Sequence, residues 1–222
     1  MIRRPAVLPL AFLLLAPLLH AAPSERLFVD AWCELEPFVR LGDDYPLSRE
    51  KASAILLEEA RYAISGMIYG FSFSYTPSDE ARRVEDRFEL KPLAEIPWSS
   101  PRLAVLDMGK EERRMTARFS YSLTDQEAAR RASWGSNTVP LATGSGEASV
   151  MGGPGERLTA IREAVKDAVR EHLRSRLYNK PREVTGEVLL WEGPETGIRS
   201  GSYVTRVKVR LLLDEIVPYR FY

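Results

Sequence analysis

Alternation of apolar and polar residues in three separate segments is the feature that most restricts how this chain folds. The segments span residues 69–76, 113–123 and 202–213. Successive side chains of a β-strand point to opposite faces of a sheet, so each segment predicts a strand with one buried face and one exposed face. Such strands are typical of antiparallel sheets, because these sheets can leave one face in water.

Two longer segments have the periodicity of an amphipathic α-helix. The first is expected to begin after an N-cap at Ser48 and to end near Gly70, and its apolar residues cover one broad face. The second spans residues 156–178, where an apolar arc lies opposite charged residues. Both helices are therefore predicted to pack one face against a sheet.

A shorter helix is predicted to begin at Asp125, because Thr124 and Glu127 have the spacing of a capping box. Together with the strands, these helices predict an α+β fold in which an antiparallel sheet is covered by two long helices. The order of the elements further predicts that the fold is built from two helix-plus-hairpin halves, residues 48–123 and 156–213.

Clusters of glycine, proline and polar residues mark the expected turns and loops. Residues 107–110 and 192–197 are predicted to be the turns of two hairpins. Residues 135–155 contain six glycines and are interpreted as a flexible surface loop. Residues 24–41 fit a helix face and a strand face equally well, so both assignments stay open.

The domain organisation follows from how much each part of the chain can bury. We expect residues 23–222 to form a single composite α+β domain that includes the glycine-rich loop at 135–155. The alternative is two small units, 23–134 and 156–222. One composite domain is preferred, because a lone hairpin under one helix is only marginally stable in water.

Residues 1–22 have the three-part organisation of a secretory signal peptide: a basic start, an apolar run from Ala6 to Leu19 and a small-residue end. A transmembrane helix needs about 20 apolar residues, so the shorter run here favours a cleaved leader over an anchor. Cleavage is expected after Ala21 or Ala22, with an uncleaved anchor as the alternative. The mature protein is then exported, periplasmic or extracellular, and has no transmembrane helix.

The charge balance and the scarcity of cysteine and histidine exclude several classes of function. Lys+Arg 31 equals Asp+Glu 31, so no basic excess supports nucleic-acid binding. The chain has 1 Cys and 2 His, too few for a zinc site of Cys/His type, an iron–sulfur cluster or a disulfide framework. No cofactor is therefore expected, and the thiol of Cys33 is predicted to be buried.

Side chains suited to catalysis are also few. His172 would be the one imidazole left after removal of the leader, and it falls on the apolar arc of the second long helix. A histidine packed in the core is the preferred interpretation, since no motif places a nucleophile beside it. Neighbouring carboxylates such as Glu58 and Glu59 are interpreted as surface charge. The sequence therefore favours a protein without catalysis of its own.

Basic residues at alternate positions mark two strand faces as candidate partner-binding sites: Arg206, Lys208 and Arg210 on one strand, and Arg114 and Arg118 on another. The other interpretation is local charge pairing. In the last hairpin, Glu183, Thr185 and Glu187 are the expected cross-strand partners of the first group. An anionic partner is the sharper hypothesis.

These observations predict an exported, periplasmic binding or assembly module of the cell envelope. Its expected partner is an envelope protein or an anionic envelope component, with no nucleic acid, and a homo-oligomer is allowed. One alternative is a carboxylate-dependent hydrolase of cell-wall or glycan material, which needs two acidic groups in a cleft. Another is a small-ligand carrier, which needs an apolar pocket lined by the aromatic strand, residues 69–75.

Overall fold

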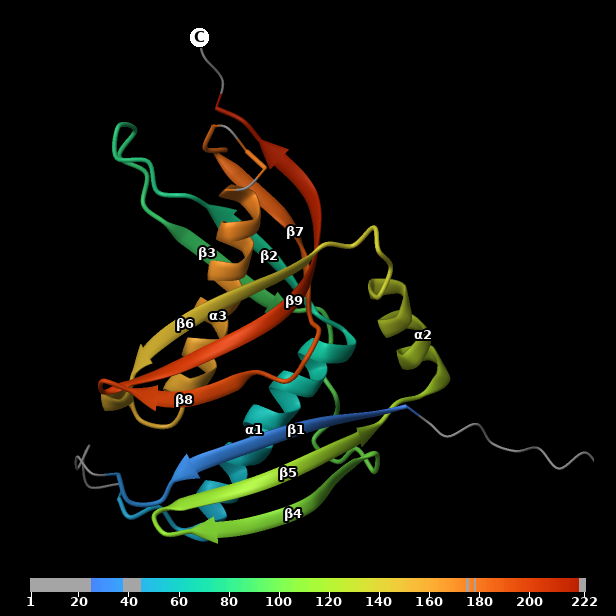
Figure 1. The fold of residues 1–222 in the computed structure, drawn as a ribbon, viewed down its shortest axis with the longest axis vertical. Helices are drawn as coiled ribbons and strands as arrows, with labels where there is room; N and C mark the ends of the chain where they lie inside the picture. The colour runs from blue at the N-terminus through green and yellow to red at the C-terminus, as the bar shows by residue number, and fades with distance from the viewer. Residues whose placement is uncertain (1–24, 38–44, 175, 178, 220–222) are drawn as a thin grey trace, which may run out of the picture.

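The computed structural model describes residues 25–37, 45–174, 176–177 and 179–219, so the predicted leader lies outside the described residues. Runs of antiparallel strands are separated by helices along the chain, which confirms the α+β class (Figure 1). The helices are α1 (Arg49–Ile68), α2 (Asp125–Trp134) and α3 (Glu156–Arg174), with a 3-10 turn, η1 (Val150–Gly152). The strands are β1 (Arg26–Glu34), β2 (Phe71–Thr76), β3 (Arg87–Pro92), β4 (Leu103–Glu111), β5 (Arg114–Ser122), β6 (Leu141–Ser149), β7 (Glu183–Leu190), β8 (Glu195–Arg199) and β9 (Ser202–Val217).

The strands of the described residues form two sheets, which corrects the expectation of one composite sheet. A three-stranded sheet has the order β1-β5-β4. A second sheet has the order β3-β2-β7-β9-β6, and β8 pairs with β9 beside this path. Helix α1 contacts β1 and β5 of the first sheet and β7 of the second. The buried apolar residues of both sheets therefore meet in one cluster around α1. The two helix-plus-hairpin halves stay a prediction.

The three-stranded sheet resolves the ambiguous N-terminal segment as strand β1. Its alternate residues Leu27, Val29 and Ala31 are buried against the core, and β1 pairs with β5 along its whole length. The β4–β5 turn lies at residues 112–113 rather than at 107–110, where the strand continues. The left-handed backbone of Glu112 (φ 49°) makes this tight reversal.

The last hairpin also turns at a different place from the predicted one. Strand β9 pairs first with β8 and then with β7, and the chain reverses at Ser200 and Gly201, both with positive φ. Positive φ at two successive central residues is typical of a tight hairpin turn. Residues 192–197, the predicted turn, instead contain the break between β7 and β8 and the first residues of β8. This difference shifts which residues face each other across β9.

The interpretation of residues 135–155 as a flexible loop was wrong, because nine of these residues form strand β6. Gly144 and Gly146 lie directly against α3: a Cβ atom on either would stand 2.2 Å from a backbone atom of Ala164. Glycine is present because helix and strand approach too closely for any side chain. The glycines therefore mark packing rather than flexibility.

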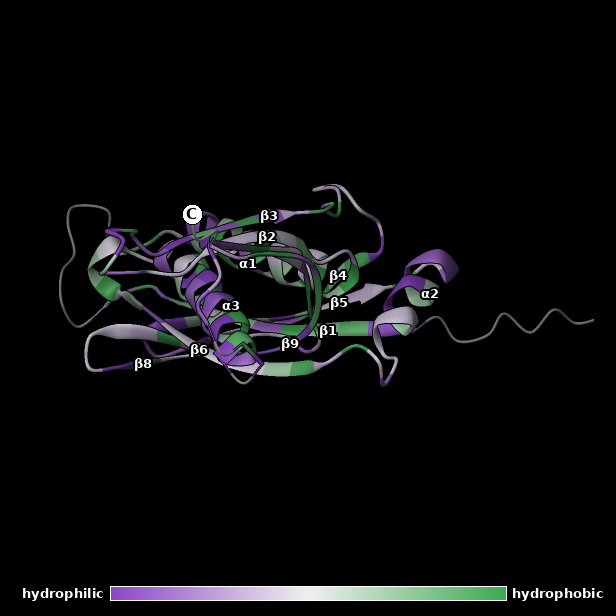
Figure 2. Ribbon diagram, turned by 90° about the horizontal axis from the view of Figure 1, so that it is seen from above, coloured by the Kyte–Doolittle hydropathy of each residue, from purple (hydrophilic) through white to green (hydrophobic). Residues whose placement is uncertain are grey.

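Two predicted helix starts are confirmed. The Ser48 side chain accepts a hydrogen bond from the Lys51 backbone at the start of α1. Thr124 and Glu127 form the predicted capping box of α2. In Figure 2 α3 alternates between hydrophilic and hydrophobic bands, whereas α2 is mostly hydrophilic, which agrees with its position at the side of the molecule, where it contacts α1. None of the helices in the described ranges is long and apolar enough to span a bilayer.

Candidate binding site at the open end of strand β9

The five predicted arginine and lysine residues do not form one surface. Arg114 and Arg118 belong to β5 in the three-stranded sheet, whereas Arg206, Lys208 and Arg210 belong to β9. Arg118 forms an ion pair with Asp30 at 3.0 Å, and the Arg114 guanidinium stacks 4.5 Å from the Trp32 ring centroid. Both residues of β5 are therefore engaged in local contacts.

Arg210 is committed to the fold. Its Nη1 donates to the Val139 carbonyl at 2.5 Å, and its guanidinium lies 4.8 Å from the ring centroid of Trp191. Trp191 and Val139 pack with Trp134 at the end of α2, so the segment after α2 covers this part of β9. We call this covered part of the strand, around Arg210, the closed end of β9.

Lys208 is paired as well. Its Nζ lies 2.8 Å from a carboxylate oxygen of Glu192, and this contact raises the pKa of Lys208 above its ordinary value. The expected cross-strand partners were wrong: Glu183, Thr185 and Glu187 face the far end of β9, because the hairpin turns later than predicted. Glu192 supplies the partner from the break between β7 and β8.

Arg206 differs from the other four basic residues. Within the described part of the chain its side chain has no hydrogen-bond or ion-pair partner, and it is exposed. Its neighbours across the strands are Glu195 on β8 and Ser145 on β6. Arg206 also lines two adjoining cavities. We call this part of the strand the open end of β9.

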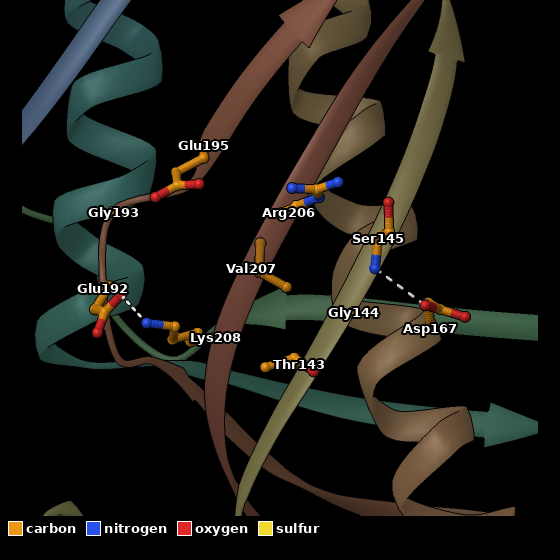
Figure 3. Close-up of a pocket in the computed structure, with 10 residues that line it drawn as sticks. All are labelled: Thr143, Gly144, Ser145, Asp167, Glu192, Gly193, Glu195, Arg206, Val207 and Lys208. Carbon is orange, nitrogen blue, oxygen red and sulfur yellow. Dashed lines mark hydrogen bonds and ion pairs between the residues drawn. The ribbon is translucent and has the colours of Figure 1, made fainter.

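The first cavity, of about 370 Å³, lies over β6, β9 and the break before β8 (Figure 3). Charged side chains from three elements line it: Asp167 from α3, Arg206 and Lys208 from β9, and Glu192 and Glu195 from the β7–β8 segment. Asp167 accepts a hydrogen bond from the Ser145 backbone at 3.0 Å, which satisfies a donor on the free edge of β6 (Figure 3). The lining is polar and of mixed charge.

The second cavity, of about 620 Å³, lies between β1 and β8 and shares Gly193, Glu195 and Arg206 with the first. Its lining also includes Trp32 of β1, Arg199 of β8 and Arg157 of α3. The Trp32 indole Nε1 donates to the Thr196 carbonyl at 3.0 Å, which connects the two strands. Arginines from α3, β8 and β9 therefore converge on one cavity.

A buried ion pair forms the base of this region, which corrects the interpretation of Glu59 as surface charge. Arg157 is 1% exposed and Glu59 is 7% exposed, and Arg157 Nη2 lies 2.7 Å from Glu59 Oε1. The Trp32 ring stacks on the guanidinium with its centroid 4.1 Å away. Arg157 Nε and Nη1 and Glu59 Oε2 are buried and have no hydrogen-bond partner among the described residues. Burial raises the pKa of Glu59, and attraction by Arg157 offsets part of that rise.

One signal in the sequence points to this pair. Arg157 lies in the first turn of α3, where the positive end of the helix dipole disfavours a cation. A basic residue at such a position indicates a specific partner. The partner itself, Glu59, belongs to the middle of α1 and is found only once the two helices are placed.

The remaining candidate residues are His172 and the aromatic strand. His172 is 9% exposed on α3, and burial and the nearby Arg176 lower its pKa. Among the described residues, no group of three or more His, Cys, Asp and Glu side chains lies close enough to hold a metal ion. Phe71 and Phe73 of the aromatic strand are buried in the core, and Tyr75 lines a cavity of about 240 Å³.

Comparisons with known proteins place the chain in a family without assigning its chemistry. The chain is 28% identical over 174 residues to an "Uncharacterized protein" of Treponema pallidum (strain Nichols), an alignment that covers 75% of this chain and 70% of the relative. No solved structure matches it. A protein-family model that carries no functional description matches residues 19–219. The chain therefore belongs to this uncharacterized family.

Proposed function

We propose that the protein is an exported, non-catalytic binding module of the cell envelope, and that it holds an anionic ligand at the open end of β9. The proposal rests on the exposure of Arg206 and on its lack of a partner among the described residues. An exposed arginine that has no partner in the described residues and is shared by two adjoining cavities is available to a ligand carboxylate or phosphate.

The balance of unpaired charge supports an anionic ligand. Glu192 is paired with Lys208, Asp30 with Arg118 and Glu59 with Arg157. The charged side chains that line the two cavities without an ion-pair partner in the described residues are Arg199, Arg206 and Glu195. The unpaired side chains therefore carry a net positive charge, although the basic and acidic residues of the whole chain are equal in number.

The cavities also support binding of a compact group or a narrow chain rather than a flat surface. Their volumes, about 370 and 620 Å³, fall in the usual range for ligand pockets. In a concave site several hydrogen-bond donors can contact one ligand group. Contact with a flat membrane surface does not require such a cavity.

Fluorescence anisotropy tests this proposal with two labelled anions, poly-L-glutamate and polyphosphate, at about 150 mM salt, where long-range attraction is screened. We expect the protein to bind at least one of them, and Arg206→Ser to weaken binding by about tenfold or more. Arg49→Ser is the matched control: it removes the same charge from the start of α1, where Arg49 is exposed and lines neither cavity, and is expected to leave affinity unchanged. Equal loss in both variants, or no binding of either anion, would contradict the proposal.

Export is a separate part of the proposal and rests on residues 1–22. We expect a mature protein that begins at Ala22 or Pro23, recovered from the envelope or the medium. Fractionation followed by N-terminal mass spectrometry measures this. Recovery of the full-length chain from the cytosol would overturn this part of the account.

A carboxylate-dependent hydrolase is a second candidate, because Asp167, Glu192 and Glu195 line the first cavity together. Two of these three carboxylates already have partners. Asp167 accepts a hydrogen bond from the Ser145 backbone and pairs with Arg170, and Glu192 pairs with Lys208. Incubation with purified cell-wall sacculi, with release of soluble fragments as the readout, separates the two functions. Release that is lost in Glu195→Gln would favour the hydrolase, whereas the binding proposal expects none.

A further inference from the structure

Strands β1 and β8 each have one edge without a strand partner in the described residues. β1 pairs with β5 alone, and β8 pairs with β9 alone. Both strands line the second cavity, β1 with Phe28, Val29 and Asp30 and β8 with all five of its residues, 195–199. The cavity therefore lies between two free sheet edges, which offer backbone donors and acceptors to an incoming strand.

The two edges are connected by side chains and not by a hydrogen-bond ladder. The Trp32 indole reaches across to the Thr196 carbonyl. Gly193 lies near the other strand, where a Cβ atom would stand 3.6 Å from the Phe28 carbonyl oxygen. Gly197 is different, because a Cβ atom there would meet nothing within 4 Å. The strands thus hold a fixed spacing around an open space of about 620 Å³.

Exposed apolar side chains accompany this pair of edges. Phe28 of β1 is exposed, as is Ile198 of β8, and both line the cavity. Apolar residues at a free strand edge are a liability in a monomer unless a partner covers them. Their position favours a ligand that contributes apolar side chains as well as charge.

Arg157 supplies the second, independent observation. It is almost fully buried, lines the same cavity and has two nitrogens without a hydrogen-bond partner among the described residues. Buried donors are nearly always satisfied in proteins, so these two mark a place for an acceptor from outside the described chain. Arg199 and Arg206 line the same cavity from the other face of β8 and β9, where a carboxylate is an acceptor that matches both.

We propose that the cavity between β1 and β8 binds an extended acidic peptide segment of another protein. The peptide backbone adds as a strand at the two free edges, and its carboxylates pair with Arg199 and Arg206, which share one face of β8 and β9. Alternate side chains of an extended peptide point in opposite directions, so its apolar residues cover Phe28 and Ile198 while its acidic residues face Arg199 and Arg206. This inference rests on the proposed function and specifies its ligand.

Three labelled octapeptides test the ligand chemistry on the whole mature protein by fluorescence anisotropy. The first alternates valine and glutamate, the second alternates valine and glutamine, and the third is the acidic peptide with every second backbone nitrogen methylated. We expect the acidic peptide to bind, and the other two to bind at least about tenfold more weakly, because one lacks the charge and the other lacks backbone donors.

A blocking variant tests the place of binding. Gly197→Leu puts a side chain into the open space, where the backbone tolerates it, so the protein is expected to fold and to lose peptide affinity by about tenfold or more. Gly155→Leu is the matched control: it also meets open space, and Gly155 does not line this cavity. The thermal midpoint of each variant reports whether it folds.

The outcomes separate this inference from the proposed function. If the methylated peptide binds as tightly as the acidic one, or if Gly197→Leu binds as tightly as the unaltered protein, the strand-addition inference is overturned. Arg206-dependent binding of poly-L-glutamate or polyphosphate would then still support the proposed function. If neither the octapeptides nor the two polymeric anions bind, both proposals fail together.

Discussion

Two arginines on the same face of strand β9 are used differently. At the closed end, Arg210 donates to the Val139 carbonyl and stacks on Trp191. At the open end, Arg206 lies over two cavities with no partner among the described residues. The structural arginine and the available one are four positions apart on one strand. The position of α2 and the segment after it decides this, because they cover only one end.

Within the open end, the surface differs from the base. Above, Arg206 and Arg199 are exposed, and below, Arg157 is fixed between Glu59 and the Trp32 ring. A binding surface on a rigid base loses little order when a ligand binds.

The largest effect is expected at the base. Glu59→Ala leaves the Arg157 guanidinium buried without its carboxylate, which should lower the free energy of unfolding by about 3–5 kcal/mol. Urea denaturation measures it. The double variant Glu59→Leu with Arg157→Met removes both charges and should recover most of the loss. If Glu59→Ala were as stable as the unaltered protein, the Glu59–Arg157 ion pair would not stabilise the base of the open end.

The next largest effect is expected where α3 lies on β6. Gly146→Ala places a Cβ atom 2.2 Å from the Ala164 backbone nitrogen, so helix and strand must separate, and we expect a loss of about 1–3 kcal/mol. Gly197→Ala, at the open end, meets open space and should change stability by less than about 0.5 kcal/mol. Thermal unfolding of the two variants compares them directly. Equal losses would contradict the distinction between packed and open glycines.

A smaller difference is expected between the two arginines themselves. Arg210→Ala removes a hydrogen bond and a stacking contact and should cost about 1–3 kcal/mol. Arg206→Ala should leave stability within about 0.5 kcal/mol, because it removes no contact within the described chain. Denaturation curves for both variants test the comparison in one experiment. A reversed order would mean that Arg206, not Arg210, is the structural residue.

The smallest effect concerns a thiol at the base of the open end. Cys33 is 1% exposed, and burial raises its pKa to about 11. Since only the thiolate reacts readily, a thiol reagent at about pH 8 should modify the folded protein far more slowly than the protein in urea. Absorbance of the released chromophore follows the reaction. Equal rates would indicate that the base of the open end is accessible to solvent.

The sequence correctly predicted those helix starts and strands that are determined by residues close together in the chain. The capping box at Thr124 and Glu127 and the N-cap at Ser48 are properties of a few neighbouring residues, and both are confirmed. Alternation also identified the strands at residues 71–76, 114–122 and 202–213. In each case the hydrogen bonds or the burial pattern that decide the structure lie within the segment.

The errors arose where distant segments decide the structure. Gly144 and Gly146 indicated a loop by composition, but they lie in a strand because α3 leaves no space for a side chain. The turn residues Ser200 and Gly201 were overlooked, which placed the wrong partners opposite the basic residues of β9. A regular alternation of glycine with serine or threonine was the available signal for β6.

The candidate site was predicted in part. Arg206 was among the five basic residues singled out, but nothing in the sequence distinguished it from Arg210, because the covering segment comes from α2. The Arg157–Glu59 pair joins residues 98 positions apart and required the fold. Residue type was therefore predictable, whereas availability to a ligand was not.

Nuclear magnetic resonance of the arginine side chains and backbone amides distinguishes an available Arg206 from an engaged Arg210 in one titration. Titration with the valine–glutamate octapeptide should shift the side-chain Nε signal of Arg206 and the amide signals of residues 195–199. The Arg210 Nε signal and the amides of α2 should stay in place, because that end is closed. Shifts that appear at Arg210 and α2 while Arg206 stays unperturbed would contradict the account.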